Sequence, residues 1–163
     1  MPETAETPAK TPLTIDTTAR ETLQAVIIGA AVGLFVGLLT FLISRFLIVP
    51  LFCRSADSFA VCANGGSIAY NSALIIVSMV AVAVLAKIGV YRPLLVSLGA
   101  AAVLWGLQSY IGPLGWFEYA AWVIGLFALA YGVFFWILRL RNFLAAVIVF
   151  VLVIVLLRVL LAL

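Results

Sequence analysis

Long runs of apolar residues, separated by short polar breaks, make up most of the chain. A helix needs about 20 mostly apolar residues to cross about 30 Å of hydrocarbon. Barrel strands instead alternate apolar and polar positions, and that alternation is missing here. The pattern predicts an all-α, polytopic transmembrane helix bundle with five spanning helices, at residues 23–44, 68–86, 94–111, 119–138 and 143–163.

The breaks between these runs are short and rich in Gly, Pro and Arg. Short links make neighbouring helices antiparallel. Residues 1–17 are polar and predict a disordered cytoplasmic tail, because they offer too few apolar groups to offset the entropy of ordering. Residues 18–163 then form a single transmembrane helical domain.

Composition supports a membrane location. Of the 163 residues, 67% are hydrophobic and 9% are charged, whereas soluble domains have roughly 45–50% apolar and about 25% charged residues. So short a chain cannot hide this much apolar surface in one aqueous core. The net charge of +3 does not indicate nucleic-acid binding, because the cations flank apolar runs, as topology signals do.

The distribution of Lys and Arg predicts the orientation. Cytoplasmic loops carry an excess of these residues. With the N-terminus inside and the C-terminus outside, six cations are inside and three are outside. The inside set is Lys10, Arg20, Lys87, Arg92, Arg139 and Arg141, and the outside set is Arg45, Arg54 and Arg158. The expected location is the inner or plasma membrane of the cell, as a multi-pass protein.

Small residues recur every four positions in the first predicted helix, as in a glycine zipper. Such a stripe lets another helix backbone approach closely. The stripe consists of Ala25, Gly29, Gly33 and Gly37, and the fourth helix carries a weaker version in Ala121, Gly125, Ala128 and Gly132. These faces predict tight helix packing, either within the chain or with another chain through self-association or a different subunit.

Cys53 and Cys62 both fall in the first predicted outer loop. An oxidising compartment permits a disulfide there, which we expect to be structural. A thiol oxidoreductase is the less favoured alternative, because redox catalysts generally use closer Cys-x-x-Cys spacing. Pro50 is expected to stop or kink the first helix, so that residues 46–52 lie along the outer interface.

Polar residues within membrane spans are candidates for function. Asn71 and Gln108 lie in the outer parts of the second and third spans. Arg158 is expected to reach the outer surface and pair with Glu118, with Asp57 as the alternative partner.

The absences limit the available chemistry. The sequence has no histidine, no acidic residue in the middle of a predicted span, and no phosphate-binding or dinucleotide-binding glycine motif. We therefore expect no cofactor, no metal site and no enzymatic activity. A conventional coupled transporter is also disfavoured, because such proteins usually place an acid or an unwound helix near the midplane.

The expected function is that of a non-catalytic accessory or scaffold subunit of a larger membrane assembly. The expected partners are the lipid bilayer and other membrane protein subunits, or further copies of the chain. The alternative is a homo-oligomeric channel or passive transport unit. In it, Gly29, Gly33 and Gly37 would line the subunit contacts, and Asn71, Gln108 and Arg158 would face a water-filled path.

Overall fold

The computed structural model describes residues 19–53, 59–90, 92–140 and 142–162, and these form helices and connecting turns without a β-strand. Three helical stretches are long and apolar enough to cross a membrane: Ala19–Phe52, Gly65–Lys87 and Trp116–Ile137. Two shorter apolar helices, Pro93–Leu104 and Phe143–Leu156, accompany them. The predicted all-helical membrane character is confirmed, and the tail at residues 1–17 lies outside the described residues.

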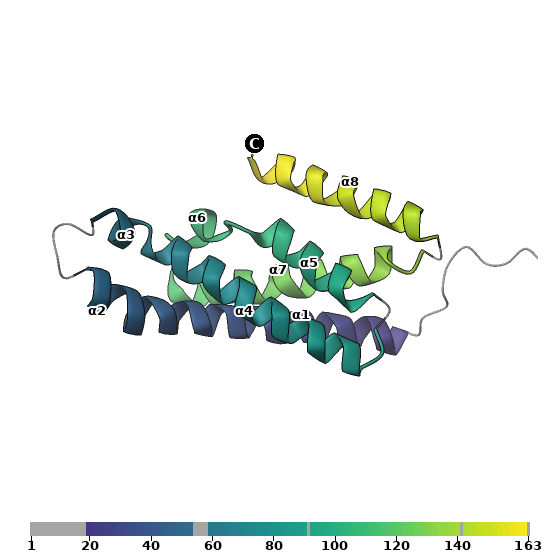
Figure 1. Cartoon of the computed structure of the whole chain (residues 1–163), viewed down its shortest axis with the longest axis horizontal. Coiled ribbons are helices and arrows are strands. Elements are labelled where there is room, and N and C mark those ends of the chain that lie inside the picture. Colours follow the sequence, from purple (N-terminus) through teal and green to yellow (C-terminus); the bar gives the residue numbers. More distant parts are fainter. Residues whose placement is uncertain (1–18, 54–58, 91, 141, 163) are drawn as a thin grey trace, which may run out of the picture.

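The first helical stretch is longer than the sequence predicted. Helix α1 (Ala19–Leu42) continues through a π-helical segment, η1 (Ile43–Ile48), into α2 (Val49–Phe52), and Figure 1 shows one rod. The expectation that Pro50 ends or kinks the helix is wrong, because the helix continues through Pro50 to Phe52. The expected position of residues 46–52 along the outer interface stays a prediction. In a regular α-helix a proline ring clashes with the carbonyl four residues earlier. Wider π turns directly precede Pro50 and relieve that restriction, and the Val49 N–H donates to the carbonyl of Ser44.

The third predicted span is not one continuous helix. After α3 (Phe59–Ala63) and α4 (Gly65–Lys87), the chain forms α5 (Pro93–Leu104), unwinds, and resumes as α6 (Gln108–Ile111). Trp105 is extended, with ψ 127°, and Gly106 has φ +78°. That left-handed backbone conformation is open to glycine at little steric cost, so the prediction of a helix throughout 94–111 is wrong.

Helix α7 (Trp116–Ile137) makes its largest contact with α1. The two backbones touch at Gly29 and Gly33. A Cβ atom added to Gly29 would lie 2.7 Å from the Phe127 carbonyl oxygen, and one added to Gly33 would lie 2.9 Å from the Ile124 Cα. Only glycine allows this approach, so the α1–α7 pair forms the centre of the bundle.

Helix α8 (Phe143–Ala162) lies against α5 and one end of α7, on the opposite side from α1 (Figure 1). The rings of Phe134 and Phe150 are 5.3 Å apart between centroids. A Cβ on Gly99 would lie 2.5 Å from Phe150, so α5 also approaches α8 closely. At the turn before α5, the Arg92 guanidinium lies 4.8 Å from the centre of the Phe143 ring, which links the two hairpin turns.

The contact between α1 and α7 predicts opposite effects of two Gly→Ala substitutions. Gly29→Ala should destabilise the fold by about 1–3 kcal/mol, because the added methyl meets backbone atoms that cannot move aside. Gly125→Ala should leave stability unchanged or raise it by up to about 1 kcal/mol, since alanine is the better helix former and no atom lies within 4 Å of its Cβ. Thermal unfolding in detergent measures both, and equal effects would contradict the assigned packing.

Candidate functional site

A disulfide closes one end of the bundle. Cys53 at the end of α2 and Cys62 in α3 are bonded, with 5.3 Å between their Cα atoms. The bond was predicted from the sequence and is confirmed. It holds the start of α4 beside the end of the long first rod, where a Cβ on Gly65 would lie 2.9 Å from the Ile48 side chain.

Replacing both Cys53 and Cys62 by Ser should lower the free energy of unfolding by roughly 2–3 kcal/mol, the chain-entropy value for a loop of this size. The fold should persist, because the bond contributes no part of the helix core. Thermal unfolding with and without a reductant checks this on the unmodified protein as well. A variant as stable as the parent would show that the link does not constrain the unfolded chain.

A cavity of about 760 Å³ lies near the start of α4, with Gly66 in its wall. We call it the Gln108 pocket. It is bounded by the second half of α1, the first half of α7, α6 and the start of α4. Its walls include Gly37, Thr40, Ser44, Gln108, Tyr119 and Val123.

One polar atom among the residues that line this pocket, the Gln108 Oε1, is buried without a hydrogen-bond partner among the described residues. The Thr40 hydroxyl donates to the carbonyl of Val36 at 2.7 Å, so its proton is already used. The buried Tyr119 hydroxyl lies within hydrogen-bonding reach of the Thr40 oxygen. Buried polar groups ordinarily find partners, and the acceptor that this pocket leaves for an occupant is therefore the Gln108 Oε1.

Hydrogen bonds between helices stabilise the region around residues 105–107, the unwound segment between α5 and α6 beside this pocket. The Tyr70 hydroxyl of α4 donates to the carbonyl of Leu104, the last residue of α5, at 3.1 Å. Nearer the start of α5, the Ser97 hydroxyl donates to the Ser78 carbonyl at 3.0 Å and accepts from the Tyr131 hydroxyl at 3.3 Å. Carbonyls at a helix end lack helical partners, so Tyr70 stabilises the break itself.

Gly106 should be the position most sensitive to side-chain branching in this segment. Gly106→Val should cost about 1–3 kcal/mol through backbone strain. Gly106→Asn should cost less, because Asn is more often found in the left-handed region than other residues with a side chain. No atom lies within 4 Å of the added Cβ, so steric contact does not complicate the comparison. Thermal unfolding measures the order, and an equal effect of Val and Asn would argue against the left-handed backbone.

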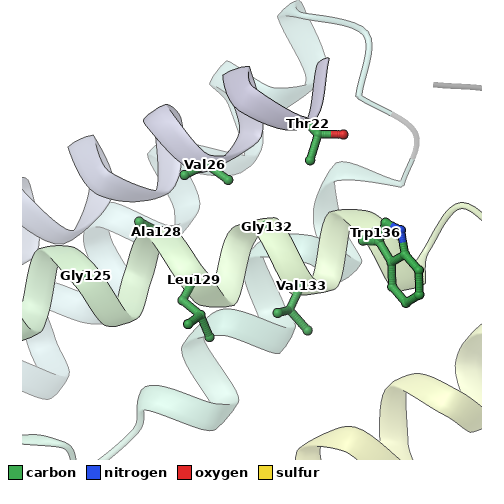
Figure 2. A pocket seen from close by; sticks show the side chains of 8 residues that line it. All are labelled: Thr22, Val26, Gly125, Ala128, Leu129, Gly132, Val133 and Trp136. Atoms are coloured by element: carbon green, nitrogen blue, oxygen red, sulfur yellow. The ribbon is translucent and has the colours of Figure 1, made fainter. Parts of the chain in front are cut away.

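A second concavity, a shallow groove of about 570 Å³, follows the other half of the α1–α7 pair, and we call it the α1–α7 groove. Figure 2 shows Val26 of α1 and Ala128 of α7 near each other, while Leu129 and Val133 extend from α7 away from α1. Gly125 leaves the backbone of α7 uncovered, whereas a Cβ on Gly132 would lie 2.9 Å from the Val26 side chain. The remaining lining residues are Thr22 and Trp136.

The small residues predicted to pack are divided between these features. Ala25, Gly29 and Gly33 are buried. Gly37 faces the Gln108 pocket, where its nearest neighbour is a ring carbon of Tyr119 at 4.0 Å. The α7 stripe is divided: Ala121 and Gly125 line a shallow hollow beside Glu118. Ala128 and Gly132 border the α1–α7 groove but also meet α1, because a Cβ on Gly29 would lie 3.0 Å from the Ala128 Cα and one on Gly132 would lie 2.9 Å from the Val26 side chain.

The polar residues singled out from the sequence do not form one cluster. Asn71 lies in α4, with its Oδ1 buried and without a partner among the described residues. Glu118 is exposed in the first turn of α7. The Arg158 side chain and Asp57 lie outside the described residues, so the pairing with Glu118 stays a prediction.

The sequence analysis did not identify Thr40 and Tyr119 as site residues. The one feature that could have indicated Thr40 is its spacing of four residues from Val36 and from Ser44, which places all three on one face of a helix.

Within the part of the chain described, no three or more acidic, Cys or His residues lie together in a group that could hold a metal ion.

Comparison with protein-family models, curated proteins and solved structures gave no match. The function must therefore be argued from the two concavities themselves.

Proposed function

We propose that this protein is a non-catalytic accessory subunit of a larger membrane assembly, and that the α1–α7 groove receives a transmembrane helix of another membrane protein. The observation that carries the proposal is the bare backbone of α7 at Gly125. A glycine in a helix costs roughly 1 kcal/mol relative to alanine, and here no atom of the described residues lies within 4 Å of an added Cβ, so close packing in that part of the chain does not explain the glycine.

The shape of the groove fits a helix better than a small molecule. It is open along its length and is lined by apolar and small residues, with Leu129 and Trp136 exposed at 62% and 65% on its border. Helices associate in membranes where small residues let backbones approach and larger side chains fill the flanks. A partner helix lying along α7 would cover Gly125, Ala128 and Leu129 together.

The proposed topology has five crossings with the N-terminus inside and the C-terminus outside. In addition to the three long stretches, α5 with α6 forms one crossing and α8 another. The basic turns around Arg92 and Arg139 then lie on the cytoplasmic side, as the positive-inside rule favours. The disulfide lies on the opposite, oxidising side. An inner or plasma membrane meets these requirements.

The alternative of a homo-oligomeric channel or passive transport unit draws on the unwound segment after Leu104, since irregular backbone within a membrane protein often borders a polar path. The glycine face of α1, which the sequence suggested as the contact between channel subunits, is less suitable for that role. Its residues Gly29 and Gly33 already pack against α7 of the same chain. Self-assembly would therefore have to use the α1–α7 groove, and one experiment addresses both proposals.

A photoreactive amino acid at Leu129 should crosslink, in native membranes, to one distinct membrane protein. The same residue placed at Leu152 of α8, which is equally exposed at 62%, serves as the matched control and should label mainly lipid. Gly125→Leu should abolish the Leu129 adduct by filling the groove, while Gly125→Ala should weaken it less. The adduct is identified by mass spectrometry.

Two results would overturn the accessory-subunit proposal. An adduct of twice the chain's mass, containing only this protein, would favour the homo-oligomer. Equal, nonspecific labelling from Leu129 and Leu152, unaffected by Gly125→Leu, would show that lipid alone covers the groove.

A further inference from the structure

We propose that the Gln108 pocket binds the head of an uncharged membrane lipid that carries a free hydroxyl group, of the diacylglycerol type. The site lies at the other end of the α1–α7 pair from the proposed partner groove. It therefore stands independently of the accessory-subunit proposal.

The pocket exists because α1 and α7 separate beyond their glycine contact. At Gly33 a Cβ would meet backbone atoms of α7 at 2.9 Å, whereas at Gly37, one turn later, the nearest atom is a ring carbon at 4.0 Å. Helix α5 ends at Leu104 and α6 is a single turn, so no long helix fills this end. The resulting volume of about 760 Å³ is within the range of about 300–1,000 Å³ usual for small-molecule sites.

The unpartnered acceptor of the pocket selects a group that donates a hydrogen bond. The Gln108 Oε1 accepts only, and therefore needs an O–H or N–H from the occupant. The Tyr119 hydroxyl lies within reach of the Thr40 oxygen, whose own proton goes to Val36, so these two side chains can satisfy each other. An alcohol supplies the one donor that the pocket lacks.

Charge excludes the common phospholipid heads. The described residues that line the pocket are Gly, Thr, Ser, Gln, Tyr, Trp and apolar residues, with no Asp, Glu, Lys or Arg among them. Burying an unpaired phosphate or ammonium group among such residues would be far more costly than burying a neutral alcohol. The pocket therefore favours neutral lipid heads over charged ones, because its described lining offers a charged head no residue of opposite charge.

The apolar part of the occupant has a matching surface. Leu34, Leu38 and Phe41 of α1 line the pocket and are exposed at 51%, 52% and 63%, so they lie at its rim rather than filling it. Ala120, Val123 and Ile124 of α7 form the opposite wall. A lipid can place its head between Gln108 and Tyr119 while its chains follow the rim into the surrounding bilayer.

The test uses the whole protein in phosphatidylcholine vesicles that contain a photoreactive, clickable diacylglycerol. The matched control is a phosphatidylcholine with the same photoreactive chain. After irradiation, peptide mapping should place the diacylglycerol adducts mainly within residues 34–44 and 116–124. Unlabelled diacylglycerol should compete for them, and the phosphatidylcholine probe should label exposed apolar faces without this preference.

Two variants test the proposed contacts. Gln108→Met keeps the length of the side chain but removes the acceptor, and should reduce labelling of the pocket roughly fivefold, as loss of one hydrogen bond does. Gly37→Leu should remove most of the labelling by filling the pocket. Gly125→Leu, in the α1–α7 groove, should leave labelling of the pocket unchanged. Thermal unfolding of each variant identifies any that fails to fold.

The proposal is overturned if the two photoreactive lipids label the wild-type protein in the same pattern. This comparison uses the wild-type protein alone, so it does not depend on whether any variant folds. The proposal is likewise overturned if folded Gln108→Met retains full diacylglycerol labelling. Neither outcome affects crosslinking from Leu129, so this proposal and the accessory-subunit proposal can fail separately.

Discussion

The close approach of the α1 and α7 backbones at Gly29 and Gly33 determines the rest of the bundle. In lipid the hydrophobic effect does not drive helices together, and association depends on close packing and on hydrogen bonds between helices. Two glycines one turn apart provide that packing over a short length only. Beyond Gly33 the two helices separate, and the Gln108 pocket arises there. On the other side of the contact Val26 still meets Gly132, and the α1–α7 groove follows the edge of the packed pair.

Polar side chains supply the second kind of adhesion, and they are concentrated around α5. Tyr70, Ser97 and Tyr131 are fully buried and form hydrogen bonds that join α4, α5 and α7. An unwound backbone within a membrane protein must be hydrogen-bonded by protein or water rather than exposed to lipid. The bond from Tyr70 to the Leu104 carbonyl meets this need where the helix stops, which allows α6 to turn Gln108 towards α1 and α7.

The sequence was sufficient for the features that depend on composition and local spacing. Apolar run length predicted the all-helical membrane character and the three long apolar helices, and two cysteines in one short loop predicted the disulfide. The break at Gly106 was not predicted, because a single glycine in an apolar run is common in spanning helices and is unwound only if the surroundings satisfy the backbone. The effect of Pro50 was misjudged for a related reason: the π segment directly before it is a property of the helix backbone that residue types do not reveal. The Gln108 pocket was out of reach because Thr40, Gln108 and Tyr119 are far apart in the chain and meet only through tertiary packing.

The rod formed by α1, η1 and α2 has a geometric consequence for the membrane around it. Its 34 residues extend over about 50 Å at the α-helical rise, against about 30 Å of hydrocarbon. Even a tilt of about 40°, the upper end for transmembrane helices, leaves it spanning nearly 40 Å of depth. At least one end of the rod must therefore extend into the headgroup layer. The first end carries the polar residues Arg20, Glu21 and Gln24, whereas the other carries Phe46, Leu47 and Leu51, all more than half exposed. If the second end extends beyond the hydrocarbon, a local thickening of the bilayer would cover these apolar side chains.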